Sequence, residues 1–183
     1  MDSCRLARVT DADSIAQVQS AAWSERFLGV WPDDLLAAID MDTMSHEWTR
    51  AILSPPSPRV RILVATDSSD VVVGFAALGP TEDPDLDDRS VELAAWEVHP
   101  AHRRHGHGSR LMSAVAATAR DLDAEAITMW LTPDEDERRR FAAACGWGPD
   151  SAHRVRVSPW SPDASRVENR LVTSVTHTDA TEL

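Results

Sequence analysis

The eleven residues from Val98 to Gly108 constrain the fold of this chain more than any other stretch. They follow the apolar segment 90–98, which lacks glycine and proline and predicts a mostly buried strand. They precede the segment 109–121, whose apolar residues recur at helical spacing. Gly106 and Gly108 carry no Cβ and can take positive φ, which lets a ligand approach the main chain closely. The stretch therefore predicts a strand, a tight loop and a helix in immediate succession.

A loop of this kind is suited to bind an anion. Consecutive amides can point inward, and the positive end of the following helix adds to them, so that a pyrophosphate group fits. Arg103 and Arg104 add positive charge. The stretch matches neither of the nucleotide fingerprints GxGxxG and GxxxxGKS/T, and the chain contains no lysine.

The stretch resembles motif A of the GNAT superfamily, the acyl-CoA-dependent N-acetyltransferases, whose pattern is V-x-P-x-x-R/Q-x-x-G-x-G/A. The matching positions are Val98, Pro100, Arg103, Gly106 and Gly108. The resemblance implies acetyl-CoA as co-substrate and no metal. It also implies that main-chain groups of one strand pair with the pantetheine amides, and that the following loop binds the pyrophosphate. The cofactor-binding residues expected on this basis are Trp96, Val98, Arg103, Arg104, His105, Gly106, His107, Gly108 and Ser109.

The order of the remaining segments predicts a single α/β domain. Its sheet is mixed and mostly antiparallel, flanked by helices, and the family resemblance implies a central parallel pair of strands, 90–98 and 126–131, that splays apart. The domain is expected over 1–175, followed by a frayed tail over 176–183. The other elements expected in the N-terminal half are a strand over 4–9, a helix from 10–13, a restarted helix from 31–34, a helix over 42–53 and a hairpin of 60–66 and 71–78. A further helix is expected from the capping box 132–135 to 145, with Pro133 in its first turn and Gly146 as left-handed cap. Closing strands are expected over 153–157 and 167–175, around the turn 159–162.

Acetyl transfer to an amine needs a base, because an alkyl ammonium with a pKa of about 10.4 is protonated at neutral pH. Glu92 stands eleven residues before Arg103, and the family resemblance implies a general base at this offset. Glu97 is the rival; its side-chain parity is opposite, so a regular strand directs only one of the two toward the acceptor. The resemblance also implies that the Val98 amide stabilises the oxyanion.

The sequence departs from the family where a general acid is expected. Many members have a tyrosine four residues before the Gly-aromatic pair, here Gly146-Trp147, and this chain has Ala142 there, preceded by Phe141. The asparagine usual seven residues earlier is replaced by Glu135. Cys145 is interpreted as core packing.

Composition limits the partners. The net charge of −12 argues against nucleic acid, and two cysteines favour a reducing cytoplasm without a disulfide framework. No apolar run has the length of a signal peptide or a membrane span, so a soluble protein without membrane partners is expected. The acidic run 82–88 is interpreted as a solvated face. The histidines at 99, 102, 105 and 107 lack the neighbours of a metal site.

The hypothesis from the sequence is a cytoplasmic N-acetyltransferase that acetylates a primary amine of a small molecule or peptide by direct attack in a ternary complex. The alternative is a catalytically weak or inactive acyl-CoA-binding sensor or interaction protein, suggested by the missing tyrosine and asparagine. The oligomeric state stays open, with a homodimer among the alternatives. The aromatic residues that would line an acceptor pocket, or simply pack helices onto the sheet, are Trp23, Phe27, Trp31 and Trp48.

Overall fold

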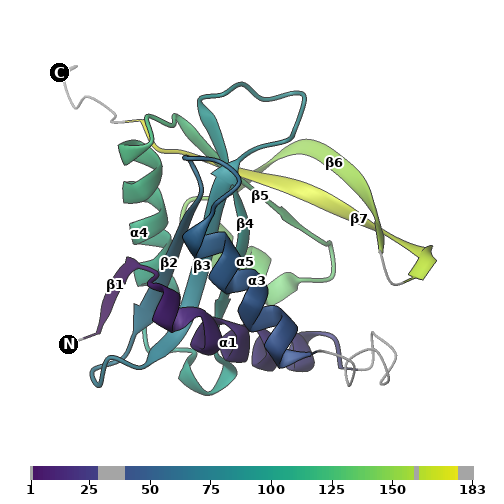
Figure 1. Ribbon diagram of the computed structural model, residues 1–183. Helices are drawn as coiled ribbons and strands as arrows, with labels where there is room; N and C mark the ends of the chain where they lie inside the picture. The colour runs from purple at the N-terminus through teal and green to yellow at the C-terminus, as the bar shows by residue number, and fades with distance from the viewer. Residues whose placement is uncertain (1, 29–39, 159–160, 177–183) are drawn as a thin grey trace.

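The computed structural model describes residues 2–28, 40–158 and 161–176, with side chains left aside over 157–164. Its seven strands form one mixed sheet in the order β1-β2-β3-β4-β5-β7-β6 (Figure 1). Among the described helices, none is long and apolar enough to cross a membrane. The elements are β1 (Ser3–Leu6), the 3₁₀ helix η1 (Val9–Asp11), α1 (Ala12–Arg26), α3 (Met41–Leu53), β2 (Arg61–Thr66), β3 (Val72–Pro80), β4 (Ser90–Val98), the 3₁₀ helix η2 (Pro100–His102), α4 (His107–Asp121), β5 (Ala126–Leu131), α5 (Asp136–Ala144), β6 (Gly148–Ser158) and β7 (Ser161–Ser174).

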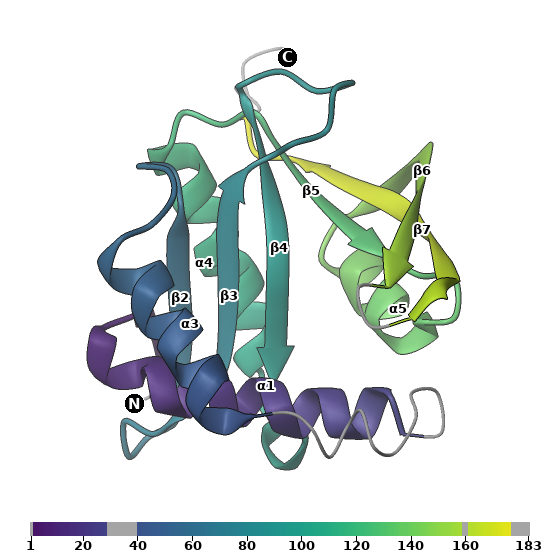
Figure 2. The same cartoon turned by 45° about the vertical axis from the view of Figure 1, so that its right-hand side comes forward.

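The predicted splay between two parallel strands is confirmed. β4 and β5 are parallel, and they pair only where Ser90, Val91 and Glu92 face Ala126, Ile127 and Thr128. All other pairings in the sheet are antiparallel. Beyond Glu92 the two strands diverge, and β5 continues beside β7 (Figure 2). The far half of β4 therefore has a main-chain edge without a neighbouring strand.

Helices cover both faces of the sheet. α1 and α3 lie on one face of β2 and β3, and α4 lies on the other (Figure 2). On the α4 side, Leu111 and Val115 are fully buried in a large cluster that reaches β5 and α5. On the α1 side, Ile15 packs with Phe75 in a smaller cluster. This arrangement leaves the N-terminus of α4 beside the end of β4.

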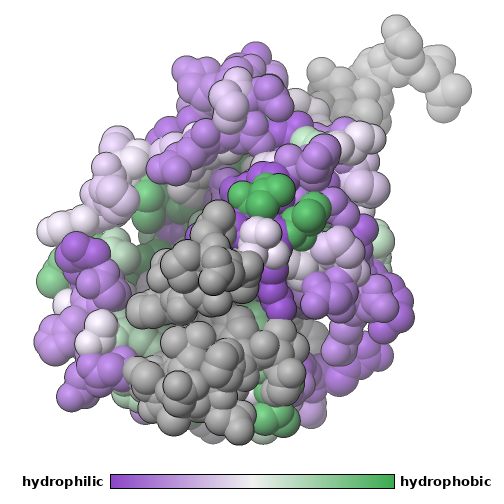
Figure 3. Space-filling view, turned by 90° about the vertical axis from the view of Figure 1, so that its right-hand side faces the viewer, coloured by the Kyte–Doolittle hydropathy of each residue, from purple (hydrophilic) through white to green (hydrophobic). Residues whose placement is uncertain are grey.

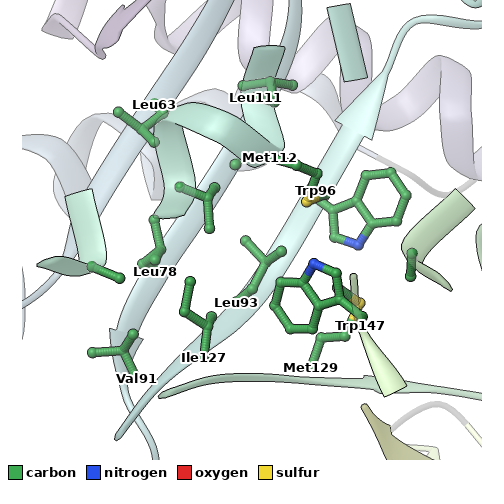
Figure 4. Packing of buried hydrophobic residues seen from close by; sticks show 14 of the residues in the cluster. Leu63, Leu78, Val91, Leu93, Trp96, Leu111, Met112, Ile127, Met129 and Trp147 are labelled. Atoms are coloured by element: carbon green, nitrogen blue, oxygen red, sulfur yellow. The ribbon is translucent and has the colours of Figure 1, made fainter. Parts of the chain in front are cut away.

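A β-bulge in β4 alters which side chains share a face. Leu78 of β3 pairs with Leu93, whereas Ala77 pairs with Ala95, so Ala94 is the extra residue. As a result, Leu93 and Trp96 lie in the same buried cluster although they are three residues apart (Figure 4). The predicted opposite parity of the two glutamates of this strand is wrong for the same reason. They lie on the same face, the one that α1 and α3 cover.

Several predicted boundaries need correction. The first strand ends at Leu6 rather than at residue 9, because Asp11 accepts the Arg8 N–H and caps η1. α4 begins at His107, two residues before the predicted start.

The helix expected from residue 132 begins only at Asp136, so Pro133 lies outside it. The Glu135 carboxylate accepts the Thr132 N–H as in a capping box, but the chain makes a turn there before the helix begins. Gly146 does take the predicted left-handed conformation, with φ of 87°. The hairpin of β2 and β3 and the closing strands are confirmed, the latter longer than predicted. The restarted helix at 31–34, residues 159–160 of the predicted turn, and the tail from 177 lie outside the described residues.

Candidate active site

The loop between β4 and α4 has the backbone of an anion cradle. Arg104 and Gly106 take positive φ, 66° and 83°, in succession around His105. Gly106 is the N-cap of α4 and has no side chain to cap it, so the first N–H groups of the helix stay available. The positive φ expected at Gly108 is wrong. That glycine lies inside α4, where a Cβ would come within 3.1 Å of Phe141 Cζ, so its role is close packing against α5.

A cleft of about 940 Å³ runs from this loop along the open edge of β4 to α1, α5 and β7. Six of the predicted cofactor-binding residues line it: Val98, Arg103, Arg104, Gly106, Gly108 and Ser109. Three others do not. The Trp96 side chain is buried in the core, His107 is buried beside Arg110, and the His105 ring is exposed, with Nδ1 2.8 Å from the Arg103 carbonyl oxygen. These three residues can still contact a ligand through their main-chain groups.

The open edge of β4 presents main-chain groups to the cleft. The His99 N–H donates to Val73 of β3. Because N–H groups alternate along a strand, the Val98 N–H points the other way, toward the side from which β5 has diverged. The Trp96 carbonyl also points there, where it accepts a hydrogen bond of 3.3 Å from Arg138 Nη2.

Four charged residues, which we call the charge cluster, join α1, β4 and α5 across the cleft: Arg26, Glu97, Glu135 and Arg138. Arg26 donates to Glu97, which is only 7% exposed. Arg138 lies 3.6 Å from the Glu97 carboxylate and 3.0 Å from that of Glu135. Sequence reasoning missed both arginines. The spacing of three between Glu135 and Arg138 predicts their own contact, but contacts across elements leave no sequence signal.

Glu92 lies on the same face of β4 as Glu97 but outside the lining of the cleft. Its side chain is 18% exposed, and Arg154 Nη1 lies 3.9 Å from it. Burial raises the pKa of Glu92, and the nearby Arg154 and the Trp130 indole oppose that rise.

The aromatic residues divide between the two interpretations. Phe27 lines the cleft, with the guanidinium groups of Arg26 and Arg166 at 5.4 and 6.0 Å from its ring centroid. Trp48 packs on Phe75 in the core. Trp23 contacts Phe27 edge-on with 6.3 Å between ring centroids. Trp31 lies outside the described residues.

Other candidate groups have structural partners. Asp83 of the acidic run forms an ion pair of 2.6 Å with the buried Arg170 of β7, so this part of the run is anchored. Cys145 is partly buried against the core, and burial raises the pKa of its thiol. Within the ranges that the structure describes, no three histidine, cysteine or acidic side chains are placed to hold a metal ion.

Comparison with known proteins covers most of the chain. Residues 15–147 match the model of the acetyltransferase (GNAT) family. Two curated relatives are similar over shorter stretches, both of them mycothiol acetyltransferases. That of Kineococcus radiotolerans is 38% identical over 77 residues, and that of Stackebrandtia nassauensis is 33% identical over 72 residues. These matches cover 42% and 39% of this chain, and the chain spans only 23% and 22% of the two relatives.

Solved structures share the whole fold. The yncA protein of Salmonella typhimurium, solved with acetyl-CoA, has a TM-score of 0.70 at 20% identity and covers 100% of this chain and 98% of its own. The paia N-acetyltransferase of Thermoplasma acidophilum, solved with coenzyme A, has a TM-score of 0.66 at 11% identity, with coverage of 95% and 99%. At these identities the likeness is one of fold. Together with the family match over residues 15–147, it means that this chain belongs to the GNAT family of acetyltransferases.

Proposed function

We propose that this protein transfers the acetyl group of acetyl-CoA to a primary amine, by direct attack within a ternary complex. The observation that carries the proposal is the continuous cleft from the α4 N-terminus to the open edge of β4. An uncapped helix N-terminus with two positive φ values suits a pyrophosphate. An unpaired strand edge suits an arm that carries amides. Acetyl-CoA combines both groups in one molecule.

The cradle residues fit this co-substrate better than a metal or a neutral ligand. Arg104 adds a positive charge that has no ion pair within the described residues, and Gly106 leaves the amides uncovered. The Val98 N–H, pointing into the cleft, is the proposed donor to the carbonyl oxygen on which negative charge develops during attack. The co-substrate supplies the activated acetyl group. The chain binds and orients the two substrates and removes a proton from the amine.

Glu92 is the proposed general base. Its raised pKa makes it a stronger proton acceptor than an ordinary glutamate. Glu97 is committed to ion pairs with Arg26 and Arg138, which occupy its oxygens. Because Glu92 does not line the cleft, the proton passes from the amine to its carboxylate through a bridging water.

The base is tested by the pH dependence of acetyl transfer to a panel of amines, followed as thiol release. Glu92 must be deprotonated to act, so kcat/KM should fall as pH drops through its pKa, above the ordinary value of about 4.3. Glu92→Gln should lower kcat/KM by about 100-fold or more and should remove this acidic limb of the pH profile, the fall of kcat/KM at low pH. The amine's own titration near about pH 10 should survive in the variant. If the limb disappears in Glu97→Gln and persists in Glu92→Gln, Glu97 is the base.

A binding protein without turnover is the second candidate, because Ala142 supplies no acid where the family resemblance places a tyrosine. Both candidates predict that coenzyme A binds, so calorimetry tests the cleft and not the chemistry. Thiol release above the rate without protein, from any amine of the panel, selects the enzyme. Binding with no release from any amine selects the sensor.

A further inference from the structure

Arg138 reaches the open edge of β4 with its side chain. Its Nη2 donates to the Trp96 carbonyl, and its Cζ lies 4.4 Å from the centroid of the Trp96 ring. The side chain also contacts Glu97 and Glu135, and it lines the cleft. Charge, position on the β4 edge and access to the cleft therefore meet in one residue.

One donor of this guanidinium is not used. The Nε–H of Arg138 is buried and has no hydrogen-bond partner within the described part of the chain. Burial lowers the pKa of Arg138, although Glu97 and Glu135 oppose this. A buried donor without an acceptor is costly, which favours an additional anionic or polar group beside it.

The neighbour of Arg138 on α5 explains why such a group matters. Ala142 lies one helical turn later on the same helix and is fully buried, so this face of α5 offers no hydroxyl. A thiolate that leaves during acetyl transfer has a free pKa of about 8.5 and must be stabilised or protonated. On this face of α5, Arg138 is the group that can stabilise the thiolate.

We propose that Arg138 stabilises the departing thiolate of coenzyme A electrostatically, in place of an acid; the inference rests on the acetyl transfer proposed above. The amine nitrogen forms a bond to the acetyl carbon, its proton goes to Glu92, and the carbon–sulfur bond breaks with its electron pair on sulfur. The thiolate then faces the guanidinium and takes a proton from solvent on release. Arg138 gives up no proton, because an arginine side chain stays charged throughout the working range.

The step predicts a lowered pKa for the thiol of bound coenzyme A. This can be measured without turnover, by comparing the affinity of coenzyme A with that of desulfo-coenzyme A, which lacks the thiol. The two ligands share all phosphates, so the ratio of their dissociation constants isolates the thiol. Calorimetry under a reductant from about pH 7 to about pH 10 spans the thiol titration.

In the wild-type protein, the affinity of coenzyme A relative to desulfo-coenzyme A should rise at least about tenfold as the pH increases across this range. A pKa lowered by one unit corresponds to a tenfold gain in binding. In Arg138→Met the ratio should stay flat, and Arg138→Lys should restore most of the gain. Arg140→Met is the matched control, because Arg140 also lines the cleft from α5. It should weaken both ligands equally and leave the ratio intact.

The charge cluster requires a second variant in case Arg138→Met unfolds. Arg138→Met combined with Glu97→Gln removes one charge of each sign, and thermal unfolding shows whether it folds. A flat ratio in the wild type, or an unchanged gain in Arg138→Met and in its double variant with Glu97→Gln, would overturn the inference while coenzyme A binding stands. If neither ligand binds the wild type at any pH, the proposed function fails together with this inference.

Discussion

At the scale of single residues, environment separates carboxylates that look alike in the sequence. Glu97 lies between two arginines, and Glu92 lies at a longer distance from one. Asp11 is bound by Arg5 and by the Arg8 N–H and is 7% exposed. Burial alone would raise the pKa of Asp11, but these hydrogen bonds outweigh it and lower the pKa below its ordinary value. Burial therefore raises the pKa of Glu92, whereas hydrogen bonds lower that of Asp11.

Asp11 yields a prediction about stability. Because its pKa is lower in the folded state, its contribution is present above the unfolded value of about 3.9 and is lost as pH falls through the folded value. Asp11→Asn should destabilise the protein by about 1.5–3 kcal/mol near neutral pH. Urea unfolding between about pH 7 and about pH 3 should show the difference from wild type shrinking. Asp121→Asn, exposed and outside the ion pairs of the described residues, should show no such trend.

At the scale of elements, the β4-α4 unit places the two halves of the site. The bulge at Ala94 brings Glu92 and Glu97 to one face, and the divergence from β5 opens the strand edge. The positive φ at Gly106 begins α4 with its amides exposed. Each of these is a local departure from regular geometry, and departures of this kind cluster at functional sites.

Gly106→Val tests the cradle. A β-branched residue at φ of 83° is strained by about 1–3 kcal/mol, so the loop should rearrange and lose its inward amides. We expect coenzyme A binding to become undetectable by calorimetry while circular dichroism still reports a folded protein. Gly148→Val is the control, because a Cβ at that glycine meets no atom within 4 Å. Unchanged affinity in Gly106→Val would place the ligand elsewhere.

At the scale of the whole molecule, the charge balance of the cleft differs from that of the chain. The chain carries a net charge of −12, and on the side viewed in Figure 3 the described side chains are mostly hydrophilic. In the cleft lining, by contrast, six acidic residues are balanced by six arginines, a third of the chain's basic residues: Arg26, Arg103, Arg104, Arg138, Arg140 and Arg166. Within the sheet, the cleft also separates β1 to β4 from β5 to β7, because β4 and β5 pair at only three residue positions.

A ligand in this cleft should therefore stabilise the whole fold. Coenzyme A at about 100 times its dissociation constant adds about 2.7 kcal/mol to the free energy of unfolding. For a domain of this size, this corresponds to a rise in Tm of about 5–10 °C. Thermal unfolding measures the shift, and hydrogen exchange should show new protection at Trp96, Val98 and the loop 103–109. Absence of both effects would contradict binding in the cleft.

The sequence by itself determined the order of elements and the cradle. Proline, glycine and arginine at fixed offsets around Val98 to Gly108 are local signals, because they specify turn geometry and a helix start. Burial of apolar strands and helix faces is also encoded locally by periodicity. The mixed sheet flanked by helices followed from this order of elements, and the family resemblance implied the splay of its parallel pair. The structure confirmed both.

Only the tertiary structure decided which charges meet. Arg26 and Glu97 stand 71 residues apart, and Arg138 reaches the Trp96 carbonyl across 42. Neither contact has a periodicity that a sequence can display, since each depends on how α1 and α5 pack around the end of β4. The bulge at Ala94 was also hidden, because one unpaired residue shifts side-chain parity without changing composition. Local sequence patterns thus predicted the fold, whereas long-range packing decided the environment of each catalytic candidate.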